Sequence, residues 1–346
     1  MIDLNYTTDI LLKLLNTPSP TGDTDAAIAL VEQAFSALGI ATRRTGKGAL
    51  LATIPGKKSD APRALSGHVD TLGGMVKEIK PDGRLRISNL GGYYPGSIVG
   101  EYCTVHTGDG KTVSGTVLLN RQSVHIHNVD NIHEQAADLQ QTEIRLDART
   151  SSAEETAALG ISVGDFVSWE PRATLTDSGF IKSRHLDDKA GVAAMLGAAE
   201  ALSRRNTIPA QTTHFYISTF EEVGHGAAAG IPADTAELLV VDMGVVGEGQ
   251  TGDEYSVSIC AKDSSGPYDL HLRRRLESLA RANGIPYRVD VFVSYGSDGA
   301  AALRAGLDAR VGLIGPGVDG SHAYERTHQE ALQATAGLIV AYLQED

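Results

Sequence analysis

The sequence has little cysteine, little positive charge and no long apolar run, and each shortage narrows what the protein can be. Its two cysteines, Cys103 and Cys260, form no CxxC pair, which argues against a disulfide scaffold and fits a reducing compartment. The N-terminus lacks a basic segment followed by an apolar core, so we expect no signal peptide. No apolar stretch approaches the roughly 20 residues of a membrane helix. We therefore expect a cytoplasmic protein without a membrane partner.

Basic residues are outnumbered by acidic ones. The chain has 30 Lys and Arg residues against 43 Asp and Glu residues, which gives a formal net charge of −13. Binding to phosphates needs a basic face, so we expect no nucleic-acid partner. The basic run Arg273-Arg274-Arg275 falls in an amphipathic helical pattern and indicates surface ion pairs.

The residue pattern changes twice along the chain, which is long enough for roughly two domains. Residues 23–38 have helical spacing, and apolar strands follow at 49–54 and 63–66. From 72 to 170, short alternating runs between glycine-rich turns predict a small all-β unit, a barrel or a sandwich. After residue 180 the pattern predicts helices at 188–203, 267–282, 298–305 and 325–343, and strands at 214–220, 238–241, 287–293 and 310–314.

This interruption predicts the domain organisation. An α/β pattern that stops, gives way to β structure and then resumes is typical of an inserted domain. We predict an α/β domain with a central mixed sheet, formed by residues 1–71 and 171–346, and an inserted, barrel-like β domain at 72–170.

Polar residues stand where the predicted strands end or the predicted helices begin. The clusters are His68-Val69-Asp70, Leu186-Asp187-Asp188, Glu221-Glu222-Val223-Gly224, Val241-Asp242-Met243-Gly244 and Ser321-His322. Such points lie at the carboxyl edge of an open α/β sheet, where ligands usually bind. Buried carboxylates need a partner or they protonate, so their convergence favours a site where metal charge compensates them.

The residue types in these clusters suit a borderline-soft divalent ion. Imidazole and carboxylate ligands without thiolates are typical of zinc, cobalt or manganese. Two ions about 3.5–4 Å apart, bridged by a carboxylate and a water, can lower the pKa of that water and stabilise an oxyanion. Such a site also needs a general base. On an extended stretch Glu221 and Glu222 would point in different directions, so one can bind metal while the other faces the water.

The same motifs resemble metallopeptidase family 42, the glutamyl, deblocking and tetrahedral (TET-type) aminopeptidases. The matching stretches, in order, are GHVD, HLDDKAG, FEEVG, VDMG and SHAYERTH, together with Arg145–Val167. The resemblance covers nearly the whole chain. It implies two divalent ions per chain, zinc or cobalt, that hydrolyse N-terminal residues from a peptide substrate. It also implies that the inserted β domain drives dimerisation and that the chain forms a homo-oligomer built from such dimers, up to a dodecamer.

The resemblance further implies a role for each site residue. The implied ligands are, for one ion, His68 and Asp242, for the other, Glu222 and His322, and for both ions, Asp187. Glu221 would be the general base, and Asp70 would orient the His68 ring from outside the ligand set.

Several neighbouring residues have ordinary interpretations. Asp188 begins a predicted helix and suits an N-cap. Glu325 fits the acidic first turn of the last predicted helix, and His328 fits a capping or packing residue within it. A polar surface or an interface of the β domain is the preferred interpretation of three more histidines: His125, His127 and His133.

Departures from the family pattern leave other functions open. His225-Gly226-Ala227 stands where many members have Leu-Arg-Gly-Ala, and Lys262–Tyr268 looks closer to a branch found with a small-peptide osmolyte system. A metal-dependent amidase or deacylase acting on a modified dipeptide or osmolyte is therefore a second hypothesis. The others are a glycoside hydrolase, which needs two carboxylates about 5–9 Å apart and no metal, and a non-catalytic binding protein.

Overall fold

The computed structural model describes residues 1–129 and 134–346, and the chain divides into two compact units. Unit 1 contains Met1–Asp70 and Ala173–Asp346, and unit 2 contains Thr71–Arg172. Within the described ranges, no helix is both long and apolar enough to cross a membrane.

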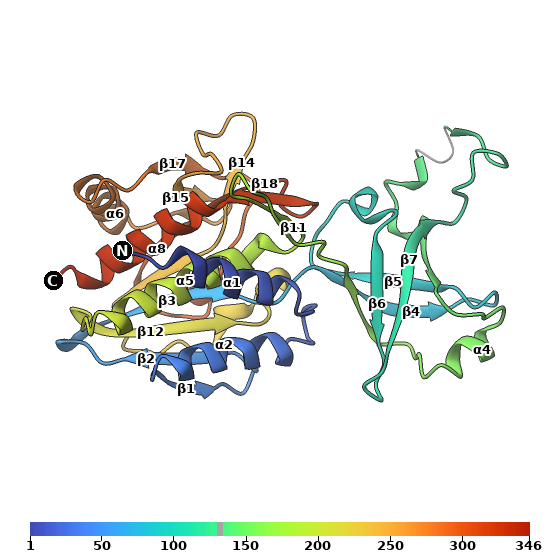
Figure 1. Ribbon diagram of the computed structural model, residues 1–346, viewed down its shortest axis with the longest axis horizontal. Helices are drawn as coiled ribbons and strands as arrows, with labels where there is room; N and C mark the ends of the chain where they lie inside the picture. Colours follow the sequence, from blue (N-terminus) through green and yellow to red (C-terminus); the bar gives the residue numbers. More distant parts are fainter. Residues whose placement is uncertain (130–133) are drawn as a thin grey trace. The chain divides into compact units, whose positions relative to one another are not determined.

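The residues of unit 1 form a mixed sheet with the strand order β1-β2-β12-β3-β13-β18-β19-β11-β10, to which β14 to β17 are added beside β18 and β15 (Figure 1). The bounds of its strands are β1 (Ala41–Arg44), β2 (Leu50–Ile54), β3 (Lys58–His68), β10 (Thr174–Leu175), β11 (Phe180–Ser183), β12 (Gln211–Ser218), β13 (Glu237–Val241), β14 (Gly244–Val246), β15 (Val257–Asp263), β16 (Gly266–Pro267), β17 (Tyr287–Val291), β18 (Arg310–Asp319) and β19 (Glu325–His328).

Helices cover both faces of this sheet. Their bounds are α1 (Leu4–Leu15), α2 (Asp25–Ala37), α5 (Leu186–Arg204), α6 (Leu270–Ala282), α7 (Asp298–Arg304) and α8 (Gln329–Gln344), with the 3-10 turns η3 (Glu221–Val223) and η4 (Gly226–Ala228). Successive side chains of a strand point to opposite faces. Phe215 of β12 therefore packs in the core under α1, α2, α5, α6 and α8, whereas Tyr216 packs in the smaller core under α7.

Helix α5 runs through the larger core and is buried from Leu186 to Leu202. Its alanines and glycines allow neighbouring helices to approach closely, and a Cβ at Gly197 would lie 2.4 Å from Thr7 Oγ1 in α1. A helix that is apolar all round is typical of a buried position between layers. This placement fixes the start of α5, where Asp187 lies, against the sheet.

Unit 2 is a closed antiparallel barrel with the strand order β4-β5-β8-β7-β6-β9. The bounds are β4 (Gly73–Ile79), β5 (Leu85–Leu90), β6 (Tyr102–His106), β7 (Thr112–Leu119), β8 (Thr142–Leu146) and β9 (Phe166–Trp169), with η1 (Pro95–Ile98), η2 (Leu139–Gln141) and α4 (Ala153–Ala157). Inward side chains such as Val76, Val117 and Trp169 fill its interior. The predicted fold class, a mixed-sheet α/β fold with a barrel-like β unit, is confirmed.

Some predicted boundaries are wrong for local physical reasons. The last helix begins at Gln329 rather than at 325, because Glu325–His328 pair with β11 as strand β19. Helix α6 begins at Leu270 rather than at 267, because Asp269 is its N-cap and accepts the Leu272 N–H at 2.7 Å. Strand β15 was not predicted, although it pairs with β18 and β17 and its residues Val257 and Ile259 are buried in the larger core.

A buried carboxylate joins three segments of unit 1. Asp298 accepts hydrogen bonds from the Ser66 hydroxyl in β3 at 2.7 Å and from the Ala227 N–H in η4 at 2.8 Å. Its side chain lies in the core, and burial raises the pKa of the carboxyl although the hydrogen bonds from Ser66 and the Ala227 N–H oppose that rise. Asp298 therefore ties the end of β3 to the segment that follows β12.

We predict that Asp298→Ala lowers the free energy of unfolding by about 2–3 kcal/mol, because it leaves the buried Ala227 N–H and Ser66 hydroxyl without an acceptor. Urea unfolding in the presence of a chelator measures this loss without any contribution from bound metal. Asp308→Ala, in the exposed loop after α7, is the control and should change stability by less than about 0.5 kcal/mol. Equal effects of the two substitutions would contradict the tying role of Asp298.

A second buried carboxylate holds the C-terminal helix. Glu237, the first residue of β13, contacts Arg275 and lies 3.6 Å from Arg63 Nε, and it accepts the Tyr342 hydroxyl at 3.0 Å. Arg63 also donates to the main-chain oxygens of Tyr342 and Glu345. Burial raises the pKa of Glu237, but the hydrogen bond and charge of Arg275 outweigh it and the pKa is lowered.

We predict that Glu237→Gln lowers the free energy of unfolding by about 2 kcal/mol at pH 7, because it leaves Arg63 with an uncompensated charge in a buried position. A lowered pKa in the folded protein means that this contribution is present above the unfolded pKa of about 4.3 and is lost as pH falls through the folded value. Melting curves of both proteins should therefore differ at pH 7 and converge in acid. Glu32→Gln, in an exposed pair with Arg44, is the control and should cost less than about 1 kcal/mol.

Candidate metal centre

Four parallel strands of unit 1 end at one edge of the sheet. Strand β3 lies between β12 and β13, β13 pairs with β18, and all of these neighbours run in parallel. Candidate ligands end these strands or follow them within four residues: His68 at β3, Glu221 and Glu222 after β12, Asp242 after β13 and His322 after β18. Asp187 reaches the same edge from the first turn of α5. The edge is where open α/β sheets bind ligands.

Asp187 stands between the two histidines. Its Oδ1 lies 3.2 Å from His68 Nε2, and its Oδ2 lies 3.3 Å from His322 Nε2. Two groups of ligand atoms, each within 4.8 Å of one another, share this carboxylate. One group is His68, Asp187 and Asp242, and the other is Asp187, Glu222 and His322. A carboxylate whose two oxygens face separate ligand groups has the geometry needed to bridge two cations.

Glu221 lies beside the first group, with Oε2 3.7 Å from His68 Nε2. The expected extended stretch is wrong, because β12 ends at Ser218 and Glu221 and Glu222 open the 3-10 turn η3. Neighbours in such a turn differ by about 120° in direction, so their side chains still diverge. Glu222 Oε2 accordingly lies 3.7 Å from His322 Nε2, in the second group.

Asp70 holds this arrangement from outside the ligand groups. Its main-chain oxygen lies 2.9 Å from His68 Nδ1, and its carboxylate lies 3.5 Å from the same nitrogen. The carboxylate also accepts the N–H groups of Glu221 at 3.1 Å and Glu222 at 3.3 Å, and the Thr21 hydroxyl at 2.8 Å. Asp70 therefore faces Nδ1 of the His68 ring, leaves Nε2 toward Asp187, and fixes η3.

The site concentrates negative charge where water is scarce. Burial and the charge of Asp187 raise the pKa of Asp242 to about 7. Burial also raises the pKa of Glu221 well above its ordinary value, against the effect of His68, and nearby Asp242 adds to the rise. Burial and Asp187 raise the pKa of Glu222 in the same way. Carboxylates held together at this depth repel one another unless a cation or protons compensate them.

Two buried atoms in these groups are suited to accept a cation. Glu222 Oε1 and Asp242 Oδ1 have no hydrogen-bond partner among the described residues. Buried polar atoms are nearly always hydrogen-bonded, so such exceptions call for an explanation, and a bound ion is one of the recognised ones. The donor set of imidazoles and carboxylates without thiolate fits zinc or cobalt. The residues therefore fit a two-cation centre.

Two further carboxylates support the ligands, and the sequence interpretation of one was incomplete. Asp188 accepts the Gly191 N–H at 3.2 Å, as expected of a helix cap, and also the His68 N–H at 3.3 Å. Glu325 was expected to be a helix-start acid, which is wrong. It is buried in β19 and accepts the N–H groups of Asp187 and His322, both at 3.1 Å. In the sequence, Glu325 is an isolated acidic residue after His322, and nothing near it indicates this role.

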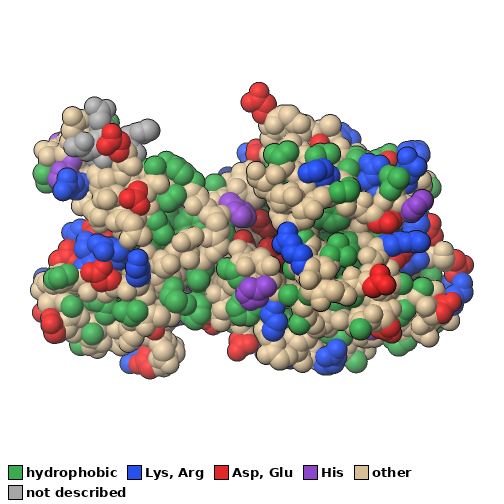
Figure 2. Space-filling view, turned by 180° about the vertical axis from the view of Figure 1, so that it is seen from behind, with side chains coloured by type: hydrophobic (Ala, Val, Ile, Leu, Met, Phe, Trp, Pro, Cys, Tyr) green, Lys and Arg blue, Asp and Glu red, His purple; other side chains and the backbone are tan. Residues whose placement is uncertain are grey.

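Neither ligand group includes His125, His127 or His328. His328 caps α8, since its Nδ1 accepts the Glu330 N–H at 3.2 Å. His125 is exposed and His127 half-buried, and both lie in an irregular turn after β7. His133 falls outside the described residues. On the face shown in Figure 2, basic side chains are interspersed with acidic and neutral ones.

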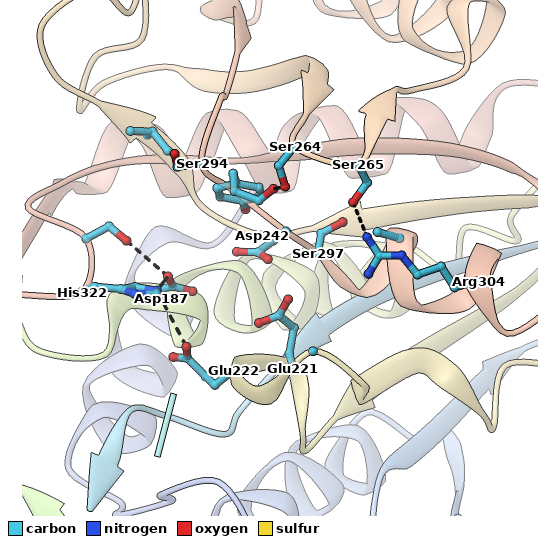
Figure 3. Close-up of a pocket in the computed structure, with 16 residues that line it drawn as sticks. Asp187, Glu221, Glu222, Asp242, Ser264, Ser265, Ser294, Ser297, Arg304 and His322 are labelled. Atoms are coloured by element: carbon cyan, nitrogen blue, oxygen red, sulfur yellow. Dashed lines mark hydrogen bonds and ion pairs between the residues drawn. The ribbon is translucent and has the colours of Figure 1, made fainter. Parts of the chain in front are cut away.

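A pocket of about 550 Å³ opens over the candidate metal centre (Figure 3). This volume falls in the range of small-molecule and peptide sites. Asp187, Glu221, Glu222, Asp242 and His322 line one part of it. Most of the other lining residues come from three segments: Ser264 and Ser265, Ser294 to Ser297, and Ala300 with Arg304. The Tyr295 hydroxyl donates to the main-chain oxygen of Met243 at 2.9 Å and so joins this wall to the residue after Asp242.

Sequence comparison finds relatives that match nearly the whole chain or part of it. YhfE of Bacillus subtilis (strain 168), whose name assigns it to the aminopeptidases, is 47% identical over 344 residues, 99% of each chain. The glutamyl aminopeptidase of Lactococcus lactis subsp. cremoris (strain MG1363) is 30% identical over 168 residues, 48% of this chain and 46% of that protein.

Comparison with solved structures shows the same fold. An aminopeptidase from the archaeon Desulfurococcus kamchatkensis superposes with a TM-score of 0.88 at 22% identity, over 99% of this chain and 96% of that chain. The Pyrococcus horikoshii TET1 peptidase, described as assembling into a tetrahedron or a large octahedral shell, gives 0.86 at 21% identity, over 98% and 100%. A family model described as M42 glutamyl aminopeptidase matches residues 48–338. The resemblance in the motifs is confirmed, and the chain belongs to the M42 glutamyl aminopeptidase family.

Proposed function

We propose that this member of the M42 family is a two-metal aminopeptidase that removes N-terminal residues from peptides. The observation that carries the proposal is the position of Asp187, whose two oxygens face separate ligand groups. The full-length likeness to proteins named as aminopeptidases supports the reaction class.

Each site residue has a definite task in this proposal. His68 and Asp242 hold one cation, Glu222 and His322 hold the other, and Asp187 is shared. Two bound divalent ions, zinc or cobalt, would supply Lewis acidity and lower the pKa of water at the centre. Glu221, outside the shared ligand groups, takes a proton from the attacking water and returns it to the leaving amine. Asp70 keeps His68 and the turn that carries Glu221 in position.

The two compact units suggest how these tasks are divided along the chain. We assign catalysis to an α/β domain at residues 1–71 and 171–346, and dimerisation to the inserted β domain at 72–170. A homo-oligomer built from such dimers, up to a dodecamer, is consistent with the printed description of the TET1 relative in fold. The two cysteines are unpaired and buried, which fits a cytoplasmic location.

We predict that Glu221→Gln retains two metal ions per chain but lowers kcat by roughly 10²–10⁴-fold, the usual contribution of a general base. Turnover of alanyl-anilide and metal content by mass spectrometry are measured on the same preparation. Glu222→Gln is the matched control, and it should lose metal because its side chain faces the ligand group of His322. Normal turnover by a fully metallated Glu221→Gln enzyme would remove Glu221 from the mechanism.

We predict that prolonged EDTA treatment abolishes hydrolysis and that added zinc or cobalt restores it, because the site has no Lewis acid other than the bound cations. The substrates are aminoacyl-anilides with a free amine and their N-acetylated forms. Free-amine substrates should be hydrolysed at least about tenfold faster if a free terminus is required. Preference for the acetylated forms would favour the amidase alternative, and full activity in EDTA would exclude a metalloenzyme.

A further inference from the structure

One wall of the pocket over the metal centre is built by residues 262–268, where the sequence departs from the family pattern. Strand β15 ends there, and the short strand β16 pairs back onto it. Ser264 and Ser265, between the two strands, line the pocket, and so does Ser297, the residue that precedes α7. Figure 3 shows these three serines on one side of the pocket and the turn η3 on the other.

A buried carboxylate holds the hydroxyl of Ser297 through a tyrosine. Asp263 is 2% exposed, and its Oδ2 accepts the Tyr268 hydroxyl at 2.8 Å. The same hydroxyl lies 2.8 Å from Ser297 Oγ. Asp263 is itself held in place, because its Oδ1 accepts the Ser265 N–H at 2.7 Å. The side chains of Asp263, Tyr268 and Ser297 therefore form a chain of hydrogen bonds that runs from a buried carboxylate to the pocket.

The direction of these hydrogen bonds follows from the number of protons. A phenol has a single O–H proton and an ionised carboxylate only accepts, so Tyr268 gives its proton to Asp263. The hydroxyl of Ser297 must then donate to the Tyr268 oxygen. One lone pair of Ser297 Oγ accepts the Gly299 N–H at 3.2 Å, as a helix cap. The second lone pair remains, so Ser297 lines the pocket as an acceptor that has no proton to give.

The protonation of Tyr268 keeps this direction fixed. Burial raises the pKa of Tyr268 well above its ordinary value, the hydrogen bond from Ser297 opposes the rise, and the charge of Asp263 adds to it. Tyr268 is therefore a phenol rather than a phenolate near neutral pH. Its proton stays between Tyr268 and Asp263.

Ser264 has the same polarity as Ser297. Its hydroxyl donates to the main-chain oxygen of Tyr295 at 2.5 Å, and a carbonyl oxygen only accepts. Two hydroxyls on this wall thus have their protons committed to the protein. Such hydroxyls accept N–H groups, and they disfavour a group that can only accept, because two facing acceptors leave both without a hydrogen bond.

We propose that Ser297 is a specificity residue that accepts an N–H group of the substrate, and that Asp263 and Tyr268 are positioning residues that keep its hydroxyl in the accepting orientation. This inference rests on the proposed aminopeptidase function and adds the hydrogen-bonding character of its substrate. The N–H group has two sources in a peptide. It belongs either to the side chain of the N-terminal residue or to the main chain beyond the scissile bond.

The experiment measures kcat/KM with the cobalt-loaded enzyme for two pairs of substrates of similar shape. Glutaminyl-anilide and the γ-methyl ester of glutamyl-anilide differ in whether the side chain has an N–H group. Ala-Ala-amide and Ala-Ala methyl ester differ in the same way beyond the scissile bond. The proteins are the wild type, Tyr268→Phe, Ser297→Ala, Ser297→Thr and the control Tyr255→Phe, which removes a phenol hydroxyl at an exposed position outside the pocket.

The wild type should prefer the N–H member of one pair by roughly fivefold or more, the usual scale of one buried hydrogen bond. In Tyr268→Phe the Ser297 hydroxyl can turn its proton toward the pocket, so the preference should fall below about twofold and kcat/KM for the ester should rise. A general loosening of the fold would lower kcat/KM for both members of a pair. Ser297→Ala should lose the preference, whereas Ser297→Thr, which keeps the hydroxyl, and Tyr255→Phe should retain it.

The outcomes separate this inference from the proposed function. A preference that survives in Ser297→Ala, or a wild type that shows none in either pair, overturns the role of Ser297, while cobalt-dependent turnover of the substrates leaves the aminopeptidase proposal standing. A preference that is lost in Ser297→Ala but unchanged in Tyr268→Phe overturns the positioning role of Asp263 and Tyr268. Absence of cobalt-dependent turnover with all four substrates overturns both the inference and the proposed function. The pair that shows the preference identifies the source of the N–H group.

Discussion

Carboxylates that are buried or largely buried crowd at the carboxyl edge of one sheet, and their mutual repulsion is the main physical constraint on this structure. Asp187, Glu221, Glu222 and Asp242 lie within reach of two histidines, and burial raises the pKa of three of the four. Asp187 departs from the others, since hydrogen bonds with His322 and His68 lower its pKa in spite of burial. Such a cluster is costly in a protein interior unless cations compensate it, and two groups of ligand atoms that share Asp187 are arranged to do so.

The scaffold around the cluster works mainly through main-chain hydrogen bonds. Asp70, Asp188 and Glu325 accept N–H groups from the residues that carry the ligands, and Asp298 ties β3 to η4 just behind them. A close approach of strands adds to this: a Cβ at Gly315 would lie 1.8 Å from the carbonyl oxygen of Asp242, so β18 can pass Asp242 only with glycine there. The positions of the ligand residues are therefore fixed by the sheet edge and by surrounding carboxylates, which accept hydrogen bonds from main-chain N–H groups and lie outside the ligand groups.

The sequence pattern predicted the fold class and the residues at the sheet edge because both depend on local signals. His68 and Asp242 each come at the end of an apolar run that predicts a strand. With the three other polar clusters, in the same order along the chain, they resemble one family. The pattern failed where the deciding partner is distant in sequence. The acceptor role of Glu325 was missed because its partner Asp187 lies 138 residues away in the sequence. No local pattern marks Arg304 as a pocket residue, because the pocket is assembled from separate loops.

The central claim is that one carboxylate, Asp187, is shared by two cations. Anomalous diffraction from crystals grown with zinc tests it most directly, since each ion appears as its own peak. The account predicts two peaks per chain about 3.5–4 Å apart, one against His68 and Asp242 and the other against Glu222 and His322, with an Asp187 oxygen beside each. A single peak, or two peaks that do not share Asp187, would contradict it.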